Sequence, residues 1–144
     1  MTVRLLVGED VAAEPSRVFA VLTDWPRHQE WMLLTRAEVT GGDGRSAGSR
    51  LSAFTGVGVL GFLDTMEITG WDPPRSVSVR HTGRLVRGTG EFRVLPRPGG
   101  CRVEWEELLE VPAEALWPLA RPVAALFFGV SLRRLGALAR GREG

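Results

Sequence analysis

Residues 11–24 read VAAEPSRVFAVLTD, and within this segment the chain changes from the pattern of a β-strand to that of a helix. Pro15 suits the first turn of a helix, because the backbone N–H that proline lacks would have no partner there. Val18 and Leu22 are four residues apart, so they share one face of that helix. The segment therefore predicts a short helix that packs through one apolar side.

A second short helix is expected directly after the first. Trp25-Pro26 ends the first helix, and Pro26 can begin another one through residues 27–32 by the same argument. Upstream, Val3–Val11 has the pattern of a strand. The N-terminal part of the chain is thus predicted as one strand followed by two short helices.

Apolar and polar residues alternate over most of residues 37–111, which is typical of half-buried antiparallel strands. The clearest alternating segments are residues 51–53, 66–69, 77–80, 92–94 and 103–106. Turn-forming residues separate them at 41–44, 72–74, 82–84 and 96–100. This pattern predicts about six strands joined by hairpins.

The pattern becomes helical again after Pro112. A helix from Pro122 to Arg140 would be roughly 28 Å long at 1.5 Å per residue, which is enough to cross a sheet. A single sheet must bury its apolar face, and this helix is the one large element that can cover it. The sequence predicts one α+β domain over residues 1–144, in which a curled antiparallel sheet of about six to seven strands wraps the C-terminal helix and leaves an internal cavity.

Composition narrows the function classes. The formal net charge of +1, from 18 basic and 17 acidic residues, provides no long-range field to gather phosphate groups, so nucleic acid is not an expected partner. Two histidines and one cysteine argue against a metal site, and the single Cys101 cannot form an internal disulfide. The uncharged runs 51–63 and 122–132 are shorter than the roughly 20 residues that span a bilayer, and the N-terminus lacks a signal-peptide core. We therefore expect a cytoplasmic protein with no transmembrane segment.

Residues 11–24, together with Trp25 and Trp31, resemble the opening of the START-like superfamily, also called SRPBCC. That superfamily includes polyketide cyclase/dehydrase-like proteins and lipid-transfer domains. The resemblance is detailed over residues 9–32 and extends loosely to the whole chain through the order of its elements. It implies a helix-grip fold with a hydrophobic pocket. It implies no reaction, because the superfamily has no shared catalytic motif.

Residues 56–61 match the dinucleotide-binding pattern G-x-G-x-x-G. In a dinucleotide site these glycines must open a helix, and an acidic residue must follow about 20 residues later. The residues after Gly61 alternate like a strand instead. We interpret the segment as a glycine-rich hairpin and expect no cofactor.

Two polar side chains fall on the apolar face of the predicted sheet. A turn centred on Asp72-Pro73 would place Asp64 opposite His81, with about 5 Å between their Cβ atoms. A buried carboxylate would raise the pKa of the imidazole and produce a group that moves protons near neutral pH. The alternative is a structural or ligand-orienting pair.

Glu107 is a third polar residue on that face. A turn at Gly83-Arg84 would set His81 opposite Val86, whereas Glu107 falls opposite Gly90. At 3.3 Å per residue, Glu107 would then lie roughly 13 Å from His81 along the strand direction, and two strands away. We therefore expect Glu107 to be separate from the aspartate–histidine pair, either as a polar anchor for a ligand or at the pocket mouth.

The leading hypothesis is that the chain binds a small, largely apolar ligand, lipid-like or polyketide-like, between the sheet and the C-terminal helix. Asp64, His81 and Glu107 would orient its polar end. The expected walls are Met66, Val79, Phe92, Trp105, Phe127 and Val130. The enzymatic alternative is a cyclase or dehydratase in which His81, oriented by Asp64, takes and returns a proton.

The last helix supports a third hypothesis, because it is apolar around most of its circumference. Its apolar residues fall on two sides, with Val123, Phe127 and Val130 on one and Phe128, Leu132 and Leu135 on the other. One side can meet the sheet, and the other needs a partner. That partner could be the short helices, a ligand tail, a second copy of the chain or a membrane surface. An interaction protein would use this side to dimerise or dock.

Overall fold

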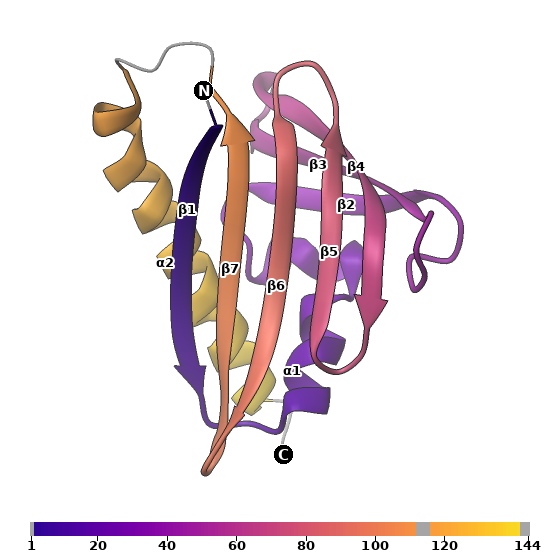
Figure 1. The fold of residues 1–144 in the computed structure, drawn as a ribbon, viewed down its shortest axis with the longest axis vertical. Coiled ribbons are helices and arrows are strands. Elements are labelled where there is room, and N and C mark those ends of the chain that lie inside the picture. The colour runs from indigo at the N-terminus through magenta and orange to yellow at the C-terminus, as the bar shows by residue number, and fades with distance from the viewer. Residues whose placement is uncertain (1, 112–115, 142–144) are drawn as a thin grey trace.

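The computed structural model describes residues 2–111 and 116–141 and shows one antiparallel sheet with helices on its inner side (Figure 1). The strands are β1 (Thr2–Val11), β2 (Thr35–Gly41), β3 (Arg50–Val57), β4 (Leu60–Asp72), β5 (Ser76–Thr82), β6 (Arg87–Arg97) and β7 (Gly100–Glu110). The helices are α1 (Pro15–Leu22), the 3-10 helix η1 (Trp25–Glu30) and α2 (Trp117–Gly141). The strand order is β1-β7-β6-β5-β4-β3-β2, so β1 and β2 are the free edges of an open sheet. The predicted α+β helix-grip fold is confirmed.

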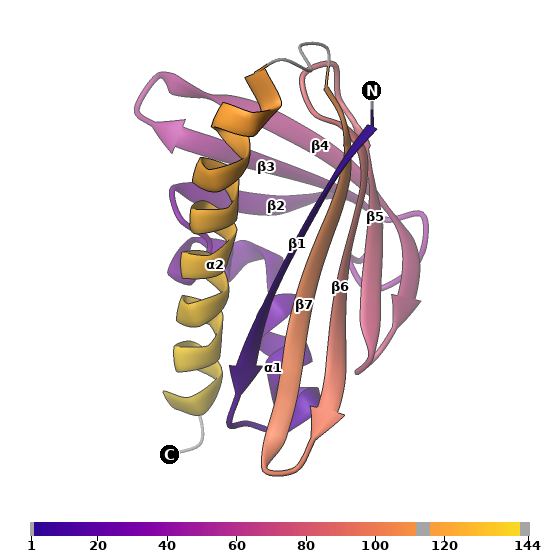
Figure 2. The ribbon, with the colours of Figure 1, turned by 60° about the vertical axis from the view of Figure 1, so that its left-hand side comes forward.

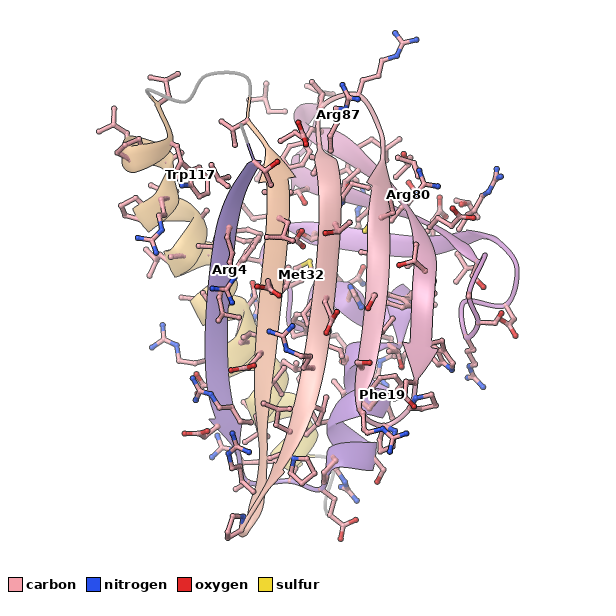
Figure 3. The ribbon with its side chains drawn as sticks, viewed as in Figure 1. Arg4, Phe19, Met32, Arg80, Arg87 and Trp117 are labelled. Atoms are coloured by element: carbon pink, nitrogen blue, oxygen red, sulfur yellow. The ribbon has the colours of Figure 1, made fainter. Side chains whose placement is uncertain are left out.

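The sheet separates an apolar inner face from a charged outer face. Ile68 and Val103 point inward and are at most 1% exposed, whereas Glu67 and Arg80 pair with each other on the outer face. Figure 3 looks onto that outer face, where Arg4 and Arg80 project from the sheet. The strands therefore alternate as half-buried strands should.

Helix α2 runs beside β1 and packs mainly on β1 and α1 (Figure 2). Leu132 and Leu135, in its C-terminal half, are completely buried. The N-terminal half carries exposed leucine and valine side chains, of which Leu119 is 74% exposed. The helix thus closes one end of the core and extends past it at the other.

Helix α2 begins before the predicted start at Pro122. Pro118 occupies its first turn, where a proline is tolerated, and Pro122 lies inside the helix at the cost of one backbone hydrogen bond. By length and composition alone α2 could cross a membrane, because an 18-residue window within it has a mean hydropathy of 1.3. The core helix of a globular protein satisfies the same criterion. The expectation of no such segment rested on uncharged runs, which Arg121 and Arg133 interrupt.

The glycine-rich segment 56–61 forms the β3–β4 hairpin, as predicted. Gly58 adopts φ +60° at its tip, a conformation that favours glycine. A Cβ on Gly56 would lie 2.2 Å from the carbonyl oxygen of Leu60. The glycines therefore serve the turn.

Candidate functional site

A cluster of ionisable side chains lies on the inner face, across β4, β5 and β7. His81 Nδ1 is 2.9 Å from Asp64 Oδ1, and His81 Nε2 is 2.8 Å from Glu107 Oε2. The indole Nε1 of Trp105 donates a hydrogen bond of 3.0 Å to Glu107 Oε1. His81 is 8% exposed and Glu107 is 6% exposed. Two carboxylates thus bracket one buried imidazole.

The Asp64–His81 contact forms by a register different from the predicted one. His81 pairs with Met66, because the β4–β5 turn spans residues 73–75 and a bulge shifts the register between Ile68 and Gly70. Asp64 is therefore a diagonal neighbour of His81 on the same face, which is still within reach of its side chain. Asp64 and His81 are in contact, as predicted, but they are not directly opposite each other in the strand pairing, and that part of the prediction is wrong.

The expectation that Glu107 stands apart from His81 is also wrong. His81 pairs with Gly88 rather than with Val86, because the β5–β6 hairpin is longer than the assumed turn. Glu107 pairs with Gly90, as predicted. The two side chains are therefore offset by two residues along the sheet instead of four, and Glu107 completes the cluster.

Glycines on β6 make the bridge possible. Gly88 and Gly90 lie between His81 and Glu107 and present no side chain to the inner face. A Cβ on Gly90 would lie 2.7 Å from Glu107 Oε1. Two glycines at inward positions of a central strand are the sequence signal that would have located this contact.

The cluster fixes the protonation of His81. Burial by itself disfavours the imidazolium, but hydrogen bonds to Asp64 and Glu107 and their negative charges outweigh it and raise the pKa of His81 to about 10. At neutral pH the ring is a cation that donates both N–H groups. Because neither nitrogen is free to accept a proton, the structure does not support His81 as a general base.

We expect Gly90→Ala to destabilise the protein. The new methyl group would push the Glu107 carboxylate away from its partners, and a hydrogen bond to a charged group contributes roughly 1.5–3 kcal/mol. Replacing a glycine inside a strand by alanine stabilises the folded state by only about 0.5–1 kcal/mol, because the unfolded chain loses conformational freedom. The free energy of unfolding should therefore fall overall. Urea denaturation at pH 7 measures it. Gly129→Ala, in open space on α2, is the control and should not destabilise the protein; a Gly90→Ala variant as stable as wild type would contradict the account.

The residues expected as walls of the pocket are buried to different degrees. Val79 and Trp105 are almost completely buried, at 9% and 4% exposure. The others, Met66, Phe92, Phe127 and Val130, are half-buried. We use the term apolar inner surface for Phe62, Met66, Phe92 and Phe128, which keep part of their area accessible beside the cluster.

Phe128 shows which of the two apolar sides of the last helix meets the sheet, a choice that the sequence analysis left open. Its ring stacks on Trp105 with centroids 3.9 Å apart and planes 9° apart. It therefore belongs to the face of α2 that meets the sheet, together with Leu132 and Leu135. The exposed face carries Val123 instead.

Two hollows lie away from this cluster, on the outer face. The larger, of about 420 Å³, is lined by polar residues that include Arg50, Thr65 and Arg80 and also by Leu51 and Met66. The other, of about 360 Å³, lies near Arg36 and Phe54. Both hollows are lined by charged side chains of the outer face, and neither includes Asp64, His81 or Glu107. The internal cavity therefore stays a prediction. Its support is the area that the side chains of the apolar inner surface leave accessible.

The second histidine has a packing role. The ring of His28 lies between Trp25 and Trp31, with both centroid distances at 4.8 Å. Its Nε2 donates to the carbonyl oxygen of Leu22. Burial lowers the pKa of His28 to about 4, against the opposing effect of that hydrogen bond. Among the described residues, no group of three or more histidine, cysteine or acidic side chains could hold a metal ion.

Residues 3–140 match the family model described as polyketide cyclase / dehydrase and lipid transport. The chain belongs to this family. The protein Rv2574 of Mycobacterium tuberculosis, described as uncharacterised, is 31% identical over 137 residues, which cover 88% of this chain and 78% of that protein.

Solved structures support the same fold for this polyketide cyclase/dehydrase family member. Protein MLL2253 from Mesorhizobium loti matches with a TM-score of 0.76 at 16% identity, covering 99% of both chains. The di-domain ARO/CYC StfQ from the steffimycin biosynthetic pathway matches with a TM-score of 0.78 at 16% identity, covering 100% of this chain and 52% of that one. At these identities the likeness establishes the fold alone.

Proposed function

We propose that this protein binds a small, largely apolar molecule against the apolar inner surface, with the cluster of Asp64, His81 and Glu107 holding the polar end of the molecule. The family description names polyketide cyclases, dehydrases and lipid transport, all of which handle molecules of this kind. The observation that carries the proposal is a charged cluster on an otherwise apolar inner face. Apolar residues of similar volume in its place are often neutral or stabilising, so its presence favours a functional role.

The apolar inner surface would supply most of the affinity. Phe62 is 41% exposed although it points to the inner side of β4, and Phe92 and Phe128 are half-buried. Each 100 Å² of apolar ligand area removed from water contributes about 2.5 kcal/mol before the costs of association. A ligand with one or two rings or a short alkyl chain would therefore bind measurably.

The test uses N-phenyl-1-naphthylamine, an apolar dye whose fluorescence rises when it leaves water. We expect saturable binding to the wild type and a loss of about tenfold or more in affinity for Phe62→Asp, because a carboxylate would enter the apolar inner surface. Leu63→Asp is the matched control: Leu63 is the next residue, points outward and is 55% exposed. Equal binding by wild type and both variants would refute the proposal.

The enzymatic alternative remains a cyclase or dehydratase, and the cluster is the observation that favours it. With both nitrogens of His81 bonded, the group able to accept a proton from a substrate would be Asp64, which His81 positions. This reassigns the role that the sequence analysis gave to His81.

We propose a further surface function for the end of the molecule where α2 begins. The β3–β4 hairpin and the start of α2 lie at the same end in both ribbon views (Figures 1 and 2), and Figure 3 places Trp117 and Arg87 there too. Val59 is 97% exposed, Leu60 79% and Leu119 74%. Exposed apolar side chains at the same end of the molecule as a cationic side chain, Arg87, suit the surface of an anionic membrane.

Sedimentation with vesicles tests this contact. We expect binding to vesicles that contain phosphatidylglycerol, weaker binding to pure phosphatidylcholine, and a loss of about fivefold or more for Val59→Asp. Leu6→Asp is the control, since Leu6 is exposed to a lesser degree on the outer face of β1. Binding unchanged in Val59→Asp, or light scattering that shows a stable dimer through this end, would overturn the membrane proposal.

A further inference from the structure

The hydrogen bonds of the cluster fix its net charge. The two bonds that His81 makes, to Asp64 and to Glu107, each require one proton. Three groups that share two protons carry one negative charge, whether the protons sit on the imidazole or on a carboxyl group. The inner face therefore presents a net charge of −1 at this point.

One acceptor of the cluster remains open. Both oxygens of Glu107 accept hydrogen bonds, one from Trp105 and one from His81. Asp64 bonds to His81 through Oδ1, and its Oδ2 receives no hydrogen bond from any residue that the structure describes. Counting side-chain atoms alone, Asp64 is 16% exposed, whereas the side chain of His81 is 5% exposed and that of Glu107 is 8% exposed. A ligand on the apolar inner surface would meet the cluster at Asp64 Oδ2.

No arginine of the described strands β4 to β7 lies on the inner face beside this charge. Within the described strands, every arginine of β4 to β7 occupies a position that pairs on the outer face, as Arg80 does with Glu67. The nearest neighbours of Asp64 on the inner face are Phe62 and Met66 on the same strand and Ala53 opposite it, while the hydroxyl of Thr55, opposite Phe62, is bonded to Thr35. An anionic ligand group would therefore meet repulsion there, because both N–H groups of the one nearby cation, His81, are already bonded to Asp64 and Glu107.

We propose that the site selects ligands with a hydroxyl, phenol or amine donor and rejects free carboxylates, with Asp64 Oδ2 as the acceptor. This inference rests on the proposed binding function and names its ligand class. Fatty acids in their ionised form are excluded, whereas alcohols, phenols and amines with an apolar body are admitted. A hydrogen bond to a carboxylate inside an apolar site discriminates strongly between a donor and its methylated analogue.

Three naphthalenes of matched size test the selection by displacement of N-phenyl-1-naphthylamine at pH 7. We expect 2-naphthol to displace the dye about tenfold better than 2-methoxynaphthalene, which lacks the donor, and 2-naphthoate to be the weakest. In Asp64→Asn the carboxamide oxygen can still accept from His81, while its NH₂ group faces the ligand. That variant should lose the preference for 2-naphthol and bind 2-naphthoate better than the wild type does.

The control is Glu67→Gln, which makes the same charge change on the outer face of the same strand and should keep the wild-type ranking. If the dye does not bind the wild type, the proposed function itself fails. If the dye binds but 2-naphthol and 2-methoxynaphthalene displace it equally, or 2-naphthoate matches 2-naphthol, the binding function stands and the donor selection is refuted. The wild-type ranking decides this even if Asp64→Asn does not fold.

Discussion

Replacing His81 by leucine is expected to lower the free energy of unfolding by about 3–5 kcal/mol at pH 7. The imidazolium is the one cation between the partly exposed Asp64 and the buried Glu107, so its removal leaves the two carboxylates facing each other without compensation. Urea denaturation at pH 7, with the midpoint and slope fitted separately, measures the loss.

The neighbouring residue provides the control for this variant. Arg80 lies next to His81 on β5 but points outward, and its guanidinium pairs with Glu67 in solvent. An exposed ion pair contributes about 0–1 kcal/mol, so Arg80→Leu should change stability little. The double variant His81→Leu with Glu107→Leu should recover part of the loss, because it removes the orphaned charge as well. Equal effects of His81→Leu and Arg80→Leu would contradict the buried cluster.

The order and type of the helices and strands could be predicted from the sequence, because they depend on the spacing of apolar residues along the chain. The change from period two to period 3.6 after Val11, and again near the C-terminus, predicts the strand, the two short helices, the sheet and the last helix. The start of α2 was not predictable from Pro122, because a proline inside a long helix is a tolerable local cost when the rest of the helix is well packed. The choice of which apolar side of α2 meets the sheet depends on packing, which placed Phe128 on Trp105.

The candidate site could be predicted only in part, because the contacts between its residues depend on the pairing register of the strands. Alternation predicts that Asp64, His81 and Glu107 share one face, and the structure confirms this. Their distances follow from turn lengths and from the bulge after Ile68, and alternation does not encode either. An error of two residues in one hairpin keeps every side chain on its face but moves it by about 6.6 Å, which separated Glu107 from the pair.

The stability of the protein is expected to peak near pH 6.5, with the two histidines responsible for opposite arms of the curve. The pKa of His81 rises from 6.5 to about 10 on folding, so its contribution is complete below pH 6.5 and is lost as the pH rises toward 10. The pKa of His28 falls from 6.5 to about 4, so its contribution is present above pH 6.5 and is lost as the pH falls toward 4. Each arm has a limiting slope of about 1.4 kcal/mol per pH unit.

Few side chains other than His81 titrate in the alkaline range of this stability curve. The chain has no tyrosine and all 18 of its basic residues are arginines, so no phenol or lysine titrates with His81. Burial raises the pKa of the Cys101 thiol, which adds to the loss of stability only above its unfolded value near 9. Between pH 7 and 8.5 the slope should therefore come from His81, and Cys101→Ala should leave it in place.

Nuclear magnetic resonance can assign both arms, since the chain has only two histidines. The imidazole carbon-bound proton of His81 should titrate above pH 9 and that of His28 below pH 5, each identified by its loss in a leucine variant. Denaturation of His81→Leu should show a flat alkaline arm up to pH 8.5 while the acid arm remains. A His81 signal that titrates near 6.5 would mean that the two carboxylates do not hold the imidazolium, and both the charge of −1 and the open acceptor on Asp64 would then lose their basis.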